Sequence, residues 1–173
     1  MKIVTTPMCE EIVKLAGIEH YEVNKNPDLE DGDLAILLSE SKVKMDSIPI
    51  KLNTPSQIFE SIKKVSKIAN TNLSDGEILE FFKDYKLSSK YLNDYDNSNV
   101  KVKVYSNFLK DIILNIGFSI VEIDYDYIIY PDYLKNKGIE MNSKSVEIPS
   151  HKFVSKNPFE RIEVRYSILE KLI

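Results

Sequence analysis

Few side chains in this sequence could act as a nucleophile or a soft metal ligand, because it contains one cysteine and two histidines. Cys9 falls in the first turn of an expected helix, where the positive end of the helix dipole lowers the pKa of a thiol. His151 follows an expected strand, so the two could pair as nucleophile and base or as two metal ligands. Glu10 and Glu11 oppose ionisation of Cys9, and a free cysteine is commonly a small buried hydrophobe. Cys9 and His151 are therefore candidate catalytic residues, with an inert Cys9 as the preferred interpretation, and no metal site is assigned.

Polar side chains follow most of the expected strands. In open α/β sheets, ligands bind beyond the carboxyl ends of the strands, and in a protein with two lobes they bind between the lobes. The sequence does not identify the ligand or cofactor. The candidate binding residues are Thr6, Cys9, Ser39, Glu40, Asn53, Ser106, Asp132, Tyr133 and His151.

A cluster of tyrosines lies in the second half of the chain, at Tyr125, Tyr127, Tyr130 and Tyr133. It could form an aromatic wall for a flat ligand such as a tetrapyrrole or a flavin, or an interface patch, since tyrosine is favoured at binding hot spots. The simpler interpretation is a strand at a sheet edge whose tyrosine hydroxyls reach water. We prefer that interpretation.

Strands and helices alternate in the first 70 residues. We expect Gly17 to end a short helix that begins near Cys9, with its backbone in the left-handed conformation. Thr54 and Pro55 read as the N-cap and first residue of a longer helix. The apolar face of this longer helix consists of Ile58, Phe59, Ile62, Val65 and Ile68. The expected strands cover residues 2–6, 20–23, 34–38 and 48–52.

The same order of elements recurs at an offset of 100 residues, the distance from Gly17 to Gly117. A strand at 102–106 and a helix at 107–116 precede Gly117, and strands at 127–130 and 146–148 follow it. Asn157 and Pro158 then open a last helix. Its apolar face consists of Phe159, Ile162, Tyr166 and Leu169. Few aligned positions are identical, so the alternative is a coincidence of the kind that any βαβ protein can show.

These patterns predict an α/β protein with two small, pseudo-duplicated, Rossmann-like lobes and mostly parallel sheets. The lobes cover residues 1–70 and 100–173, and a helical connector and linker cover residues 71–99. Ser74 and Glu77 have the spacing of a capping box at the start of the connector helix. Its apolar stripe consists of Ile78, Leu79, Phe81 and Phe82. Residues 87–99 are polar and are interpreted as a linker or surface loop without a functional role.

Composition excludes several classes of protein. The chain has 173 residues and a net charge of -4, with a pI near 5.3 and a mean hydropathy of -0.24. No apolar run is long enough for a membrane span, and the acidic balance argues against nucleic-acid binding through a basic surface. The N-terminus reads as a strand without a secretion signal, so a cytoplasmic protein is expected. A single cysteine rules out zinc ribbons, CxxC redox pairs and four-cysteine iron–sulfur clusters from one chain.

The basic residues are almost all lysines, because only Arg161 and Arg165 are arginines. Arginine is the side chain suited to bidentate binding of phosphate or carboxylate. None of the five glycines has the spacing of a Rossmann fingerprint or a Walker A loop. A nucleotide enzyme built on this chain would have to use lysines, backbone amides and a metal.

The duplicated lobe plan resembles the helical-backbone metal-receptor proteins of the cobalamin and siderophore type, and the lobes of nitrogenase-component-like proteins. The run from Ile48 to Pro55, with the helix that follows, is similar to their strand-then-helix element. The composition, rich in lysine, asparagine and isoleucine and poor in arginine, resembles that of AT-rich methanogenic archaea. The chain as a whole is similar to the small uncharacterised methanogenesis marker proteins, marker five among them. This resemblance implies a cytoplasmic role near methanogenesis or its cofactors, without catalytic residues to assign.

Three functions follow from these patterns. The leading one is a non-catalytic accessory or binding protein that holds a cofactor, a metal centre or a partner protein in a crevice between the lobes. The second is a cysteine-dependent enzyme that uses Cys9 and His151. The third is a subunit of a larger, methanogenesis-related assembly, which would present the tyrosine cluster and residues 74–82 to protein partners.

Overall fold

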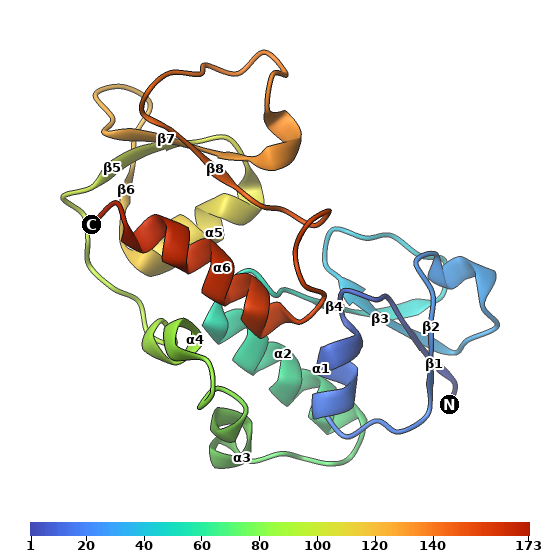
Figure 1. The fold of residues 1–173 in the computed structure, drawn as a ribbon. Coiled ribbons are helices and arrows are strands. Elements are labelled where there is room, and N and C mark those ends of the chain that lie inside the picture. The colour runs from blue at the N-terminus through green and yellow to red at the C-terminus, as the bar shows by residue number, and fades with distance from the viewer.

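The computed structural model describes residues 1–173 as two α/β lobes joined by a short helical connector (Figure 1). The N-terminal lobe contains β1 (Ile3–Thr5), α1 (Glu10–Leu15), β2 (Tyr21–Val23), β3 (Leu34–Leu38), β4 (Asp46–Ile50) and α2 (Pro55–Ile68). The connector contains α3 (Asp75–Glu80) and α4 (Lys86–Lys90). The C-terminal lobe contains β5 (Lys101–Val104), α5 (Asn107–Ile116), β6 (Ser119–Ile120), β7 (Tyr127–Pro131), β8 (Ser145–Ile148) and α6 (Pro158–Glu170).

The two lobes share one sheet topology. The strand order is β2-β1-β3-β4 in the first sheet and β6-β5-β7-β8 in the second, and every strand pair is parallel. Gly17 and Gly117 follow the first helix of each lobe with φ of 86° and 89°, in the left-handed region that favours glycine. The expected α/β fold with two Rossmann-like lobes and parallel sheets is therefore confirmed.

Three of the predicted helix starts are present with their caps. The Thr54 side chain accepts a hydrogen bond from the first turn of α2, and the Asn157 side chain does the same for α6. Ser74 and Glu77 form both hydrogen bonds of a capping box at α3. Each cap satisfies amide groups that have no partner inside the helix, which explains why these chain positions start helices.

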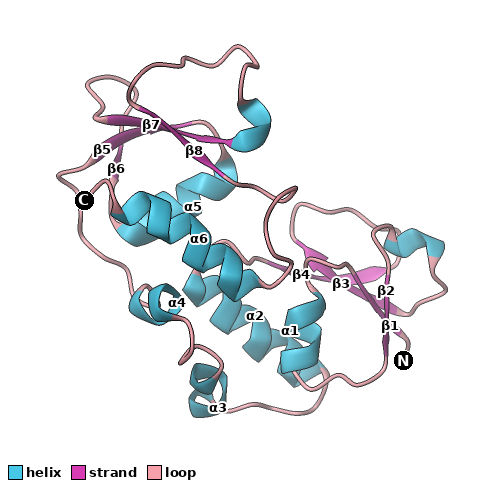
Figure 2. Ribbon diagram, in the orientation of Figure 1, coloured by secondary structure: helices cyan, strands magenta, loops and turns pink.

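One hydrophobic cluster of 27 buried residues runs through both lobes. Figure 2 shows α2, α5 and α6 between the two sheets, with α3 and α4 at the edge of the molecule. Helix α2 packs against α1, α3 and α6. The predicted apolar face of α6 is fully buried, and the centre of the α2 face is buried as well. Because the core continues from one lobe into the other, the lobes pack as one unit. None of the helices has the length and apolar character that a membrane crossing requires.

The connector is more ordered than the sequence indicated. Residues 87–99 were expected to be a linker or surface loop, but they include most of α4, and Tyr91 is completely buried. The interpretation of this segment as surface is therefore wrong for Tyr91, which packs against Tyr166 of α6. Leu79, expected in the apolar stripe of α3, is 45% exposed.

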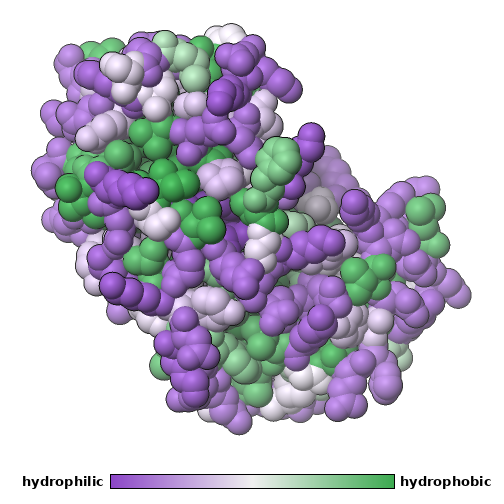
Figure 3. All heavy atoms as spheres, in the orientation of Figure 1, coloured by the Kyte–Doolittle hydropathy of each residue, from purple (hydrophilic) through white to green (hydrophobic).

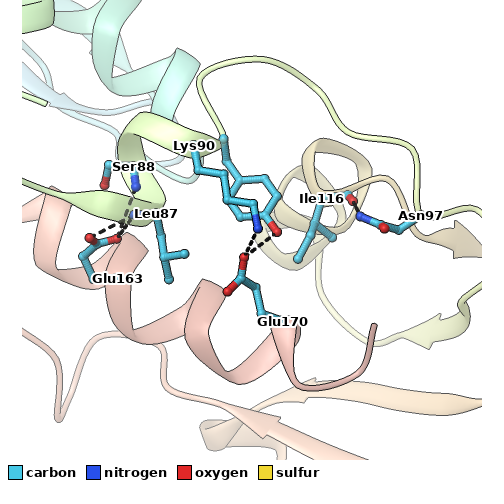
Figure 4. A network of polar contacts seen from close by, with 8 residues as sticks. Leu87, Ser88, Lys90, Asn97, Ile116, Glu163 and Glu170 are labelled. Atoms are coloured by element: carbon cyan, nitrogen blue, oxygen red, sulfur yellow. Dashed lines mark hydrogen bonds and ion pairs between the residues drawn. The ribbon is translucent and has the colours of Figure 1, made fainter. Parts of the chain in front are cut away.

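Polar contacts fasten α4 to α6 (Figure 4). The Glu163 carboxylate accepts hydrogen bonds from the amides of Leu87 and Ser88, at 2.9 and 3.2 Å from its Oε2 atom. The Tyr91 hydroxyl donates to Glu170 at 2.9 Å. Glu163 thus caps α4 from another helix, a contact between residues more than 70 positions apart that no local pattern reveals.

The tyrosine cluster does not lie on an edge strand. β7 is paired on both sides, with β5 and with β8, so the edge position expected from the sequence is wrong. Tyr130 is buried, and its hydroxyl donates to Glu147 at 3.3 Å. Tyr133 lies just after the strand and is exposed. The four tyrosines therefore do not form one continuous aromatic wall.

Candidate functional site

A cavity of about 500 Å³ lies between the lobes, at the carboxyl ends of strands from both sheets. On the face shown in Figure 3, the outline of the molecule is indented between the lobes and mostly hydrophilic residues border the indentation. Both lobes contribute polar side chains to the cavity. Its lining consists of Ser39, Glu40, Lys51, Asn53, Ser106, Asn107, Phe108, Asp111, Tyr133 and His151.

Hydrogen bonds across the cavity join the two lobes. Asp111 of α5 accepts from Asn53 Nδ2 at 3.1 Å and from Gln57 Nε2 at 2.9 Å. Gln57 Oε1 in turn accepts from the backbone N–H of Asn53 at 2.9 Å, which fixes the orientation of the Gln57 side chain. These contacts fix the position of one lobe relative to the other at the wall of the cavity.

An aromatic surface forms part of the C-terminal side. The rings of Tyr133 and His151 are stacked with an interplanar angle of 12° and centroids 6.4 Å apart. Asp132 does not line the interlobe cavity, and its carboxylate accepts a hydrogen bond from the Ser150 hydroxyl. It lines an adjoining depression of about 770 Å³ that the C-terminal lobe forms alone and that shares Tyr133 and His151 with the cavity. A ligand between the lobes could therefore contact the Tyr133 and His151 rings.

A small recess of about 40 Å³ adjoins the cavity and shares four of its lining residues. Arg161 and Arg165, one helical turn apart on α6, line the recess and are only 2% and 4% exposed. Burial lowers the pKa of each guanidinium to about 10, because the low-polarity surroundings disfavour the charged form. The residues lining the recess are Met8, Leu38, Glu40, Leu52, Asn53, Phe108, His151, Arg161 and Arg165.

Backbone carbonyls hold the two guanidinium groups. Arg161 Nη1 donates to the carbonyl oxygens of Lys156 at 2.8 Å and Ser155 at 3.2 Å. Arg165 donates through Nε to the carbonyl of Pro149 at 2.9 Å and through Nη2 to that of Ser150. The Arg165 guanidinium also lies 5.1 Å from the centroid of the Phe108 ring. The segment between β8 and α6 therefore anchors both arginines at the recess.

Cys9 and His151 are not brought together as a catalytic pair. Cys9 is completely buried in the hydrophobic cluster, and burial raises the pKa of its thiol to about 11. His151 is exposed at the cavity, and no hydrogen bond links it to Cys9. The lowering of the thiol pKa expected from the helix start is therefore wrong, because desolvation outweighs it and α1 has only six residues.

The cavity brings together most of the other predicted binding residues. Ser39, Glu40, Asn53, Ser106 and His151 line it, together with Tyr133. Thr6 and Cys9 line neither the cavity nor the recess, and Asp132 lines only the adjoining depression of the C-terminal lobe. The rule that ligands bind at the carboxyl ends of strands thus selected one contiguous surface from sequence positions far apart.

Sequence reasoning missed the residues that lie on helices. Asp111 and Phe108 belong to α5, and Gln57 to α2. Arg161 and Arg165 were not among the predicted binding residues. A signal was available, since Arg161 and Arg165 are four residues apart and border the apolar stripe of α6, a position where a charged side chain is unusual.

No group of three or more His, Cys, Asp or Glu side chains is arranged to hold a metal ion.

No family model and no curated protein matches the chain. Solved structures do share its fold over nearly the whole length of both chains. The comparisons therefore describe the fold and do not assign the chain to a family.

Three of these similar structures have two-lobed binding-protein folds. The periplasmic vitamin B12 binding protein BtuF of Vibrio cholerae has a TM-score of 0.54 at 10% identity, covering 99% of this chain and 96% of that one. A mutant form of a periplasmic metal binding protein from Candidatus Liberibacter asiaticus, in its metal-free state, has a TM-score of 0.58 at 8% identity, covering 100% of both chains. The binding protein FpvC of P. aeruginosa, in complex with Ni²⁺, has a TM-score of 0.53 at 10% identity, covering 99% and 97%.

Proposed function

We propose that this chain is a non-catalytic binding protein that holds a small solute between its two lobes. The observation that carries the proposal is the cavity of about 500 Å³ whose polar lining comes from both lobes. This volume lies within the range of roughly 300–1,000 Å³ that is typical of small-molecule sites. The larger depression beside Tyr133 is formed by one lobe alone, so it does not use the two-lobed architecture.

The packing between the lobes indicates how such a site would work. The hydrophobic cluster is continuous, and Asp111 joins the lobes through Asn53 and Gln57. A preformed site of this kind loses little conformational entropy when it binds its ligand. We therefore infer that the solute enters with small side-chain movements and without a wide hinge opening.

The solved structures of similar fold support the proposal. Two of them are a vitamin B12 binding protein and a metal binding protein, the third is in complex with Ni²⁺, and all three share the fold of this chain over nearly its whole length. A role near methanogenesis, a cytoplasmic location and a place in a larger assembly remain predictions from the sequence. The enzyme alternative lacks support from geometry, because Cys9 is completely buried in the core and no hydrogen bond links it to His151.

A thermal-shift screen with a blocked variant tests the proposal. The full chain is mixed separately with cyanocobalamin, Ni²⁺, citrate, inorganic phosphate and glucose. We expect at least one of these probes to raise the melting temperature. Ser106→Trp should abolish the effect by filling the cavity, since the Ser106 side chain lines it and makes no helix-capping bond.

Ser98→Trp provides the matched control. Ser98 is exposed and precedes β5, at the opposite end of the strand from Ser106. This variant should keep the shift that the wild-type chain shows. The proposal would be refuted if no probe raised the melting temperature, or if Ser106→Trp kept the full shift.

A further inference from the structure

The two arginines of the chain occupy an unusual position. Both are nearly completely buried, whereas the lysines are mostly exposed, and both face the recess beside the interlobe cavity. A buried charge is costly unless it is paired or fully hydrogen-bonded. Arg161 and Arg165 therefore need an explanation beyond the packing of α6.

Neither guanidinium forms an ion pair with a carboxylate of the chain. Their partners are four neutral carbonyl groups, a thioether and an aromatic ring. Nε and Nη2 of Arg161 and Nη1 of Arg165 donate to no atom of the chain. Among the side-chain nitrogen and oxygen atoms that solvent cannot reach, only Ser88 Oγ lacks a hydrogen-bond partner. The three unpaired arginine nitrogens are therefore accessible to solvent. Unused donors at a small recess are what an incoming acceptor requires.

We infer that the recess binds an oxyanion group, a carboxylate or a phosphate, carried by the solute that occupies the interlobe cavity. This inference rests on the proposed function and specifies its ligand class. A planar guanidinium offers paired donors that match the oxygen atoms of either group. A recess of about 40 Å³ accommodates one such group, while the cavity of about 500 Å³ accommodates the rest of the molecule.

Two carboxylates lie close enough to affect this charge balance. Glu40 lines the recess but is exposed and accepts a hydrogen bond from the Ser39 hydroxyl. Asp132 acts on Arg165 through its charge while it accepts a hydrogen bond from Ser150. The lining of the recess therefore carries two positive charges against one negative charge, and Glu40 should weaken anion binding.

Calorimetric titration of the full chain tests the inference. Citrate and inorganic phosphate are the oxyanion probes, Ni²⁺ is the cationic probe and glucose is the neutral one. We expect at least one oxyanion to bind with one-to-one stoichiometry. Arg161→Gln and Arg165→Gln should each weaken its affinity by at least about 10-fold, because a charge-assisted, two-donor contact is lost. Whichever oxyanion binds more tightly identifies the group as carboxylate or phosphate.

Two further variants distinguish a specific effect of the recess from an effect of net charge and from a loss of folding. Lys171→Gln removes one positive charge from the exposed end of the same chain segment, just after α6, and should leave the affinity unchanged. Glu40→Gln changes an exposed side chain and should strengthen oxyanion binding about 3-fold or more, since it removes the opposing charge. This second variant keeps the test decisive even if an arginine variant does not fold.

The possible results distinguish the inference from the proposed function. Binding of glucose or Ni²⁺ that Ser106→Trp abolishes, with no oxyanion binding, would overturn the inference and leave the proposed function standing. Oxyanion binding that Lys171→Gln weakens as much as Arg161→Gln would also overturn it, since general charge would then explain the effect. Absence of binding by every probe would overturn both.

Discussion

Replacement of the three left-handed glycines by alanine tests how the repeat is packed. Gly17 and Gly117 occupy corresponding places after α1 and α5, and Gly138 lies in a loop with φ of 79°. At Gly138 nothing lies within 4 Å of an added Cβ atom. At Gly17 the Cβ would meet the Thr71 methyl group at 2.8 Å. At Gly117 it would lie 1.9 Å from the Tyr95 carbonyl oxygen, which belongs to the backbone.

The expected losses of unfolding free energy follow from these contacts. A left-handed alanine costs about 1 kcal/mol, which is the whole effect at Gly138. Gly17→Ala should cost about 2 kcal/mol, because a side chain must also move. Gly117→Ala must push residues 95–97 away, and that segment is tied to the end of α5 by three hydrogen bonds. These run from the Tyr95 amide to the Asn115 carbonyl, from the Asn97 amide to the Gly117 carbonyl, and from the Asn97 side chain to the Ile116 carbonyl (Figure 4 shows the last). At about 1 kcal/mol each, their loss raises the cost at Gly117 to about 4 kcal/mol.

Urea unfolding of the three variants, monitored by circular dichroism, measures these differences. We expect the order Gly138, Gly17, Gly117, with a melting temperature about 10 °C lower for Gly117→Ala in a parallel thermal scan. Gly138→Ala is the control for backbone conformation alone. Equal losses for Gly17→Ala and Gly117→Ala would refute the reasoning, because the corresponding positions would then have equivalent packing despite their different neighbours.

Three further predictions follow from buried or capping groups. Burial raises the pKa of Cys9 to about 11, so iodoacetamide at pH 8 should alkylate it at least about 100-fold more slowly in the folded chain than in urea. Mass spectrometry can follow both reactions, and equal rates would contradict this prediction. Burial and the Glu170 carboxylate raise the pKa of Tyr91 to about 12, so the folded state keeps the hydroxyl proton to a higher pH than the unfolded state does. The contribution of this hydroxyl to stability is therefore complete below pH 10 and decreases as the pH rises from 10 to 12. Tyr91→Phe should therefore lose about 1 kcal/mol of unfolding free energy at pH 7 and show a smaller decrease between pH 10 and 12, and an unchanged alkaline slope would contradict the assignment. Glu163→Gln should cost about 1 kcal/mol in urea unfolding because its carboxylate caps α4, whereas the exposed Glu160→Gln should cost nearly nothing.

Much of the fold could be predicted because its signals are local. Pro55 with its preceding threonine, the Ser74 capping box and Gly17 each involve residues within one helical turn, so their spacing can be read from the sequence alone. The repeat at an offset of 100 residues then gave the order of elements in the second lobe. Parallel pairing follows from that order, because a strand, helix and strand in succession return in the same direction.

The rest could not be predicted because it depends on contacts between distant residues. Tyr91 is buried by Tyr166 and by its hydrogen bond to Glu170, neither of which its neighbours in the sequence indicate. Arg161 and Arg165 would by default be exposed, and only carbonyl groups of the segment before α6 hold them inside. The strand-end rule found the polar wall of the cavity but gave no information about side chains supplied by helices.

The central claim is that a solute binds between the lobes with its oxyanion group on the two arginines. A ¹⁵N–¹H spectrum of the full chain contains only two arginine Nε–H signals, because the sequence has only two arginines. The account predicts that titration with citrate or inorganic phosphate moves both signals in a saturable way, with one common dissociation constant. The account would be contradicted if both arginine signals stayed in place while either anion was added until all other signals in the spectrum had stopped moving.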